Sequence, residues 1–136
     1  KQLNNKEYAQ IGAFIKNSKK PFISSEFGFW YTYNTKIETN TKTPIFGDLV
    51  QYTHSLKTLD GQVIYSLNES EIKTYYIDQQ ELFSGLREGL KLMKEGGSIT
   101  FLFPSQKAYG YYGDDNKIGS NVPVICDVSL LKLTNN

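Results

Sequence analysis

The chain has 136 residues, with 15 lysine and arginine residues, 14 aspartate and glutamate residues and one cysteine. The net charge of +1 gives no electrostatic reason to expect binding to nucleic acid or to an anionic membrane. A single Cys126 excludes an internal disulfide and a cysteine metal cluster. We therefore expect one domain of ordinary size, whose function depends on neither a strong net charge, nor a disulfide, nor a cysteine-bound metal.

The given sequence contains neither a segment typical of a membrane span nor one typical of a signal peptide. No apolar run reaches the roughly 18 residues that a membrane span needs, and no basic segment followed by an apolar one opens the chain. The polar start at Lys1 is typical of a trimmed mature domain. This leaves open a signal or lipid-anchor segment that has been removed.

The first half of the chain predicts one helix followed by strands. Residues 5–17 place Tyr8, Ile11, Phe14 and Ile15 at helical spacing, and Pro21 follows shortly after. An aromatic strand is predicted next, then a polar loop that ends at Pro44, then further strands: residues 27–33, the loop 34–44, and strands over 49–56, 63–67 and 72–77.

The second half predicts the principal helix and a long loop. Leu82, Leu86, Leu90 and Met93 share one face of a predicted helix over residues 79–93, which the glycines at 96–97 end. Alternating apolar residues then predict strands over residues 99–103 and 124–130, with a long loop over 104–123 between them. Loops of this length in a small domain are usually functional. The order of elements predicts an α+β domain, a mainly antiparallel sheet with one principal helix packed on it.

The residues that could carry conventional catalysis are few. His54 lies where its predicted strand ends, without a serine or carboxylate partner that spacing predicts, so we interpret it as a surface or loop-edge histidine. Cys126 lies on the apolar side of an alternating strand, where a free cysteine acts as a small hydrophobic residue. Residues 114–116 (Asp-Asp-Asn) lack the spacing of a calcium loop and are interpreted as a solvated turn. We expect no metal and no cofactor.

The long loop carries three tyrosines, Tyr109, Tyr111 and Tyr112. One interpretation is that their rings simply pack under the loop. The other is that they form the wall of a pocket and offer a hydroxyl to a ligand. Composition alone favours neither.

Several motifs, in a specific order, resemble those of the FKBP-type peptidyl-prolyl isomerases. They cover roughly residues 45–133 and run as follows: Gly47-Asp48, Val50-Gln-Tyr52-Thr53, Asp60-Gly61, Gly85-Leu-Arg-Glu-Gly-Leu-Lys-Leu-Met93, Gly96, Phe103-Pro104, Ala108-Tyr109-Gly110 and Asp127-Val128-Ser-Leu130-Leu131. The resemblance implies an FKBP-like domain over residues 21–136, with a twisted antiparallel sheet wrapped on a central helix. Residues 1–20 would then be an N-terminal helical extension.

The resemblance also implies the site. Tyr109 matches the tyrosine whose hydroxyl donates a hydrogen bond to the ligand, and Phe83 matches the position whose backbone N–H does the same. The remaining wall and floor positions that it implies are Tyr52, Ile64, Tyr65, Leu82, Leu86, Ile118 and Cys126. The sequence departs from the family pattern at Leu86, where many members have tryptophan, at Tyr65, where aspartate is usual, and near Lys73, where the residue is often aromatic.

A narrower likeness is to the gliding-motility-associated FKBP-type lipoproteins of gliding bacteria. It is carried by residues 29–36, 78–83 and 101–113, and it implies the periplasmic side of the envelope, with a lipid anchor as the membrane contact. The expected activity is cis-trans isomerisation of X–Pro bonds in unfolded or folding envelope proteins. The alternatives are a non-catalytic binding or chaperone module, and an assembly component whose N-terminal helix docks or dimerises. The sequence leaves the oligomeric state open.

Overall fold

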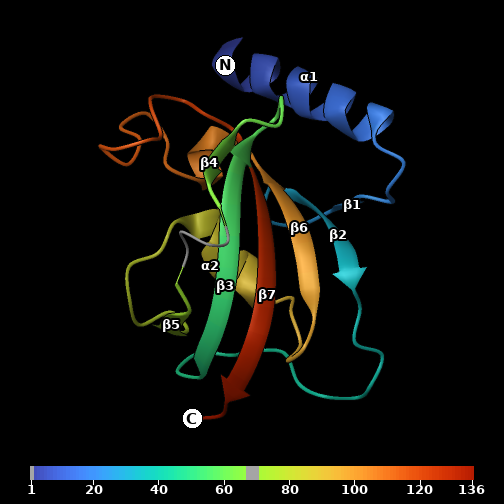
Figure 1. Ribbon diagram of the computed structural model, residues 1–136, viewed down its shortest axis with the longest axis vertical. Helices are drawn as coiled ribbons and strands as arrows, with labels where there is room; N and C mark the ends of the chain where they lie inside the picture. The colour runs from blue at the N-terminus through green and yellow to red at the C-terminus, as the bar shows by residue number, and fades with distance from the viewer. Residues whose placement is uncertain (1, 67–70) are drawn as a thin grey trace.

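The computed structural model describes residues 2–66 and 71–136. Two helices, one short 3-10 helix and seven strands follow one another along these residues, in an order that Figure 1 shows. They are α1 (Gln2–Asn17), β1 (Ile23–Ser24), β2 (Trp30–Thr35), β3 (Leu49–Thr58), β4 (Val63–Tyr65), β5 (Lys73–Tyr76), α2 (Ser84–Leu90), β6 (Ser98–Phe103), η1 (Ser105–Lys107) and β7 (Val124–Thr134).

The strands form one antiparallel sheet in the order β1-β2-β6-β7-β3-β4, and β5 also pairs with β3. The long strands β3 and β7 make its centre and pair along nearly their whole length, from Leu49 opposite Thr134 to Thr58 opposite Val124. The connection between β5 and β6 carries α2, which lies behind β3 and β7 in Figure 1. The predicted α+β, FKBP-like fold class, a sheet around one central helix, is confirmed in this arrangement.

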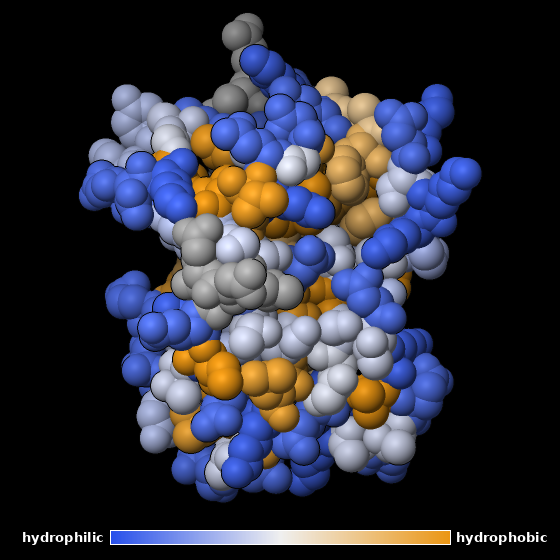
Figure 2. Space-filling model, viewed as in Figure 1, coloured by the Kyte–Doolittle hydropathy of each residue, from blue (hydrophilic) through white to orange (hydrophobic). Residues whose placement is uncertain are grey.

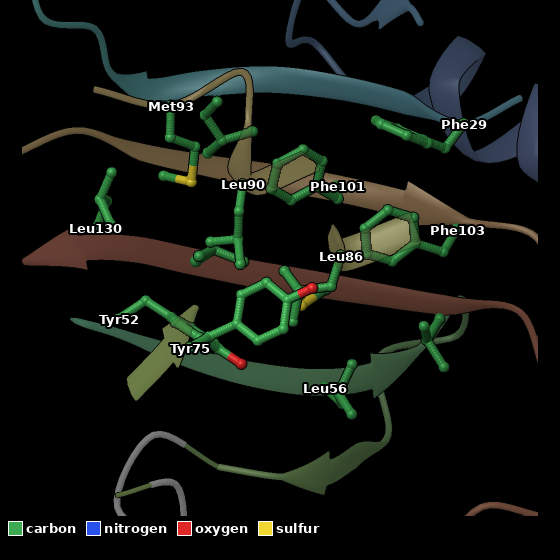
Figure 3. Packing of buried hydrophobic residues seen from close by; sticks show 14 of the residues in the cluster. Phe29, Tyr52, Leu56, Tyr75, Leu86, Leu90, Met93, Phe101, Phe103 and Leu130 are labelled. Atoms are coloured by element: carbon green, nitrogen blue, oxygen red, sulfur yellow. The ribbon is translucent and has the colours of Figure 1, made fainter. Parts of the chain in front are cut away.

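The main core fills the space between α2 and the sheet. Leu86 and Leu90 of α2 are fully buried, and Figure 3 shows them in one layer with Phe101 and Phe103 of β6. The helix lies unusually close to β6, because Gly85 has no side chain: a Cβ there would lie 2.5 Å from the Phe103 ring. Close packing of this kind fixes the position of α2, and with it the residues on either side of the helix.

The helix α1 packs on the other face of the sheet. Ile11 is fully buried against Leu102 of β6 and Ile125 of β7, and Phe14 packs at the edge of this small cluster. In Figure 1 the helix crosses one end of the long strands, and Figure 2 shows apolar surface directly below it. The predicted helix over residues 5–17 is therefore present and serves as a layer of the domain.

The helix predicted over residues 79–93 is shorter than expected, and the reasons are local. Asp78 has a left-handed backbone (φ 62°), and the Tyr76 N–H donates to the Gln80 side chain, so residues 77–80 form a turn and the helix begins only at Ser84. After Leu90 the chain continues with tighter three-residue hydrogen bonds from Lys91, Leu92 and Met93 back to Glu88, Gly89 and Leu90. The predicted strand over 27–33 instead spans Trp30–Thr35, and Leu67, predicted to end a strand, lies outside the described residues.

Candidate functional site

One open hollow, of about 400 Å³, lies beside α2 where β3, β4 and β5 meet the long loop. We call it the aromatic hollow, and the residues that line it are Tyr52, His54, Leu56, Tyr65, Lys73, Leu82, Phe83, Tyr109 and Asp114. Tyr52, His54 and Leu56 come from alternate positions of β3, since side chains two residues apart point to the same face of a strand. The connections before α2 and after η1 supply most of the opposite wall.

Tyr109 and Phe83 stand together at the rim. Their ring centroids are 4.9 Å apart, and Phe83 in turn contacts the edge of Phe103, so rings continue from the rim into the core. Burial, then the neighbouring Cys126 and Asp114, raise the pKa of Tyr109 to about 12. The hydroxyl therefore stays protonated at any physiological pH and can donate a hydrogen bond. Within the described residues neither this hydroxyl nor the Phe83 N–H has a hydrogen-bond partner, which leaves both available to a ligand.

The segment that presents Phe83 is held from two sides. Asp78, at its start, forms an ion pair of 2.7 Å with Lys91, which follows α2. The Asp78 N–H also donates to the Tyr75 hydroxyl at 3.3 Å. At its other end the Phe83 carbonyl accepts the first hydrogen bond of α2, from the Arg87 N–H at 3.0 Å. Phe83 therefore has a fixed place relative to the core.

Tyr65 and Asp114 close the hollow on the side of β4. The Tyr65 hydroxyl donates to the Asp114 carboxylate at 2.5 Å, and the other carboxylate oxygen accepts the N–H groups of Ile118 at 2.8 Å and Asn116 at 3.0 Å. Burial raises the pKa of Asp114, but these hydrogen bonds outweigh it and the pKa is lowered overall. Residues 114–116 therefore form a turn fastened to β4, which is more than the solvated turn that we expected. In this way a carboxylate still reaches the site, from the long loop, although Tyr65 occupies the position where the family usually has aspartate.

The floor below the hollow is apolar and closed. Leu86 and Cys126 are fully buried, and Ile118 and Ile64 nearly so; none of the four lines the aromatic hollow itself. Ile64 opens instead onto a neighbouring hollow with Val122. Burial raises the pKa of the Cys126 thiol well above its usual range, so this cysteine is a poor nucleophile. Leu86 and Cys126 therefore shape the site from beneath, whereas Ile64 lies beside it.

His54 contradicts the expectation of a surface or loop-edge histidine. It lies in the middle of β3, because that strand continues to Thr58 through its pairing with β7. Its ring is 5.7 Å from that of Tyr52, and its Nδ1 is buried without a partner among the described residues. Burial, and then the charge of Lys73, lower the pKa of His54, so the imidazole is neutral near pH 7.

The structure brings together five of the nine site residues that the sequence predicts: Tyr52, Tyr65, Leu82, Phe83 and Tyr109 line the hollow, whereas the other four lie beneath or beside it. It adds His54, Leu56, Lys73 and Asp114. His54 and Leu56 could have been predicted from the sequence, because they follow Tyr52 at two-residue intervals and so share one face of the strand. Tyr111 and Tyr112 neither pack under the loop nor line the hollow; they are exposed and contact each other.

No group of three or more histidine, cysteine, aspartate or glutamate side chains in residues 2–66 and 71–136 is arranged to hold a metal ion. No helix within the same residues is long and apolar enough to cross a membrane.

A sheet wrapped on one short helix, with an aromatic hollow beside that helix, defines the class of FKBP-like domains. A family model described as FKBP-type peptidyl-prolyl cis-trans isomerase matches residues 40–131. The match covers more than half of the chain. The chain therefore belongs to the family of FKBP-type peptidyl-prolyl cis-trans isomerases, as the sequence motifs predict.

Two curated relatives are similar over most of the chain. The probable FKBP-type peptidyl-prolyl cis-trans isomerase FkpA of Neisseria meningitidis is 34% identical over 131 residues, which are 95% of this chain and 46% of that protein. FkpA of Aeromonas hydrophila is 32% identical over 119 residues, which are 86% of this chain and 42% of that protein. The chain thus spans less than half the length of these relatives.

Two solved structures share the fold. The crystal structure of FkpA from Escherichia coli superimposes with a TM-score of 0.73 at 23% identity, over 98% of this chain and 63% of that one. A peptidyl-prolyl cis-trans isomerase from Pseudomonas syringae gives the same TM-score at 22% identity, over 94% of this chain and 92% of that one.

Proposed function

We propose that the chain catalyses cis-trans isomerisation of X–Pro bonds in the aromatic hollow. The observation that carries this proposal is the pairing of aromatic walls with two donors that have no partner among the described residues, the Tyr109 hydroxyl and the Phe83 N–H. A proline ring is a compact apolar group that suits such a hollow, and the peptide carbonyls on either side need hydrogen-bond donors. Membership of the family supports the same activity.

The reaction requires rotation about a bond that resonance makes partly double, with a barrier of about 18–20 kcal/mol. A planar amide is more polar than a twisted one, because twisting removes the conjugation that separates charge. Walls such as Tyr52, Leu82 and Phe83 exclude water and so disfavour the planar amide relative to the transition state. The Tyr109 hydroxyl and the Phe83 N–H would hold the flanking carbonyls while the bond turns.

The side chains near the hollow favour this non-covalent route over nucleophilic catalysis. The Cys126 thiol is fully buried with a raised pKa, so little reactive thiolate forms. His54 has no hydrogen-bonded hydroxyl or carboxylate partner among the described residues, as a catalytic histidine would need. What remains is shape, burial and hydrogen bonding.

The test is an isomerisation assay on X–Pro peptides, by coupled proteolysis or by NMR exchange. We expect the intact chain to accelerate exchange and the double variant Tyr109→Phe with Phe83→Ala to lose most of that acceleration, roughly a hundredfold in kcat/KM if each change costs about 1.4 kcal/mol. Tyr112→Phe is the matched control, because Tyr112 is 85% exposed and does not line the hollow. No acceleration by the intact chain, or equal rates for the double variant and the control, would contradict the proposal.

A second candidate is a chaperone module that binds unfolded segments without catalysis. The observation that favours it is the floor, where Leu86 replaces the tryptophan of many family members and is fully buried. This function predicts that the chain suppresses aggregation of an unfolded client equally well when the client's prolines are replaced. Suppression that disappears with the prolines would instead support the isomerase.

We infer the setting from the likeness of the sequence to the gliding-motility-associated FKBP-type lipoproteins: a periplasmic location, proline-containing envelope proteins as clients, and a lipid anchor in a longer form of the protein. By the same likeness, we infer that the protein could act as an assembly component of a gliding or secretion machine.

The N-terminal helix α1 packs on its own domain. Burial of Ile11 against the sheet favours this packing over a role of α1 as a docking or dimerisation element. Light scattering of the intact chain tests this, since a monomeric mass would remove the dimerisation alternative.

A further inference from the structure

A buried carboxylate connects the N-terminal helix to the loop that carries Tyr109. Glu7 belongs to α1, yet its side chain is only 3% exposed. One carboxylate oxygen accepts the Ser105 N–H at 2.7 Å and the other accepts the Ser105 hydroxyl at 2.6 Å. A carboxylate is costly to bury unless hydrogen bonds replace its lost water, and these two short bonds do so. The two residues are 98 positions apart in the sequence.

Ser105 in turn holds both flanks of Tyr109. It is the first residue of η1, and its carbonyl accepts the N–H groups of Ala108 at 2.9 Å and of Gly110 at 2.8 Å. Tyr109 lies between these two anchored residues. Its place over the aromatic hollow therefore depends on where Ser105 is held.

The helix that supplies Glu7 is itself firmly seated. Ile11, one turn further along α1, is buried against Leu102 and Ile125. Tyr8 makes an edge contact with Trp30 of β2, with ring centroids 5.8 Å apart, and its hydroxyl lies 3.4 Å from the side-chain nitrogen of Gln106. The sheet thus fixes α1, and α1 fixes the start of the loop.

We propose that Glu7 is a positioning residue for Tyr109, which makes α1 a working part of the prolyl site. This inference rests on the proposed isomerase function, because it concerns how that function's hydrogen-bond donor is held. Glu7 touches no substrate; it acts through Ser105 on the orientation of the Tyr109 hydroxyl. A helix that only covered the sheet would need apolar residues at this place and no buried charge.

The experiment compares Glu7→Ala and Glu7→Gln with Glu26→Gln, an exposed glutamate whose change also removes one negative charge. We expect Glu7→Ala to lower kcat about tenfold with little change in KM, because a misplaced donor fails mainly in the transition state. Glu7→Gln should keep roughly a third of the activity, since its amide oxygen still accepts one bond from Ser105. Glu26→Gln should match the intact chain.

A double variant separates positioning from general damage. In the Tyr109→Phe background, Glu7→Ala should cause no further loss, because the hydroxyl that Glu7 positions is absent. Amide hydrogen exchange gives a second measurement: in Glu7→Ala, the Gly110 N–H that bonds to Ser105 should lose protection, while the Leu130 N–H, bonded to Gly97, should keep it.

The possible results distinguish the two proposals. An intact chain without any acceleration overturns the isomerase function and this inference with it. An active chain in which both Glu7 variants equal Glu26→Gln overturns only the inference. So does an equal loss from Glu7→Ala with and without the Tyr109 hydroxyl, since Glu7 would then act by another path. A loss confined to the background that has the hydroxyl supports the role of Glu7.

Discussion

The rim and the floor of the aromatic hollow are built from different kinds of structure. The rim residues Phe83, Tyr109 and Asp114 lie in connections between elements and are held by hydrogen bonds and an ion pair. The floor residues Leu86 and Cys126 lie within α2 and β7 and are held by apolar packing. The difference implies that changes in the rim should alter activity with little loss of stability, whereas changes in the floor should alter the fold first.

The largest expected effect is at the floor. Leu86→Ala removes a fully buried side chain from the layer between α2 and β6, and deletions of this kind usually cost about 3 kcal/mol in the free energy of unfolding. Leu131→Ala in β7 is the matched control, because Leu131 is 45% exposed. Urea denaturation measures both. A loss for Leu86→Ala no larger than that of the control would show that the floor does not belong to the core.

A smaller effect is expected at the rim. Tyr65→Phe removes the donor to Asp114, and for a hydrogen bond that is partly open to solvent we expect a loss of about 0.5 kcal/mol in the free energy of unfolding. Freed from β4, the loop after Tyr109 should hold a peptide less well, so KM should rise more than kcat falls. Tyr76→Phe is the control, since Tyr76 is exposed on β5 and lies outside the hollow. Equal KM values for the two variants would remove Tyr65 from the site.

The sequence predicts the floor better than the rim, for a physical reason. Apolar periodicity is a local signal, so the shared helix face of Leu86 and Leu90 and the alternation of Phe101 and Phe103 are visible in the chain itself. The pairing of Tyr65 with Asp114 joins residues 49 positions apart, and nothing in either segment specifies the other. That partnership exists only once the fold has brought β4 to the long loop.

The local sequence pattern also fails to predict the burial of polar residues on strands and helices. His54 looks like the end of a strand until the pairing of β3 with β7 carries that strand on to Thr58. Glu7 looks like part of the solvated face of α1, since charged residues on an amphipathic helix usually face water. Its burial against Ser105 follows from where the sheet places α1. Motif resemblance predicts Phe83 and Tyr109 as site residues, but residues that would act through tertiary contacts can be recognised only from the structure.

His54 lies on the central strand β3 and lines the aromatic hollow, so it contacts both the sheet and the site. Its lowered pKa arises from burial and then from Lys73 on β5; the other charged or titratable groups around the hollow are Tyr52 beside it and Tyr65, Tyr109 and Asp114 across from it. A group with a lowered pKa in the folded state is protonated more readily in the unfolded state. Stability is therefore unaffected above the unfolded value near 6.5 and falls as the pH drops from there toward the folded pKa.

The smallest expected effect is thus a dependence on pH. In the intact chain, the free energy of unfolding should decline modestly as the pH falls below about 6.5, and kcat/KM should fall at still lower pH, when a charged imidazole forms beside Lys73 in the aromatic hollow. His54→Gln keeps a polar side chain without this titration, so both profiles should flatten. Parallel profiles for the two proteins between pH 7 and pH 5 would show that folding leaves the pKa of His54 unshifted, as expected of a side chain that faces water. The aromatic hollow would then be more open to solvent on the side of β3 than the burial of the His54 Nδ1 indicates.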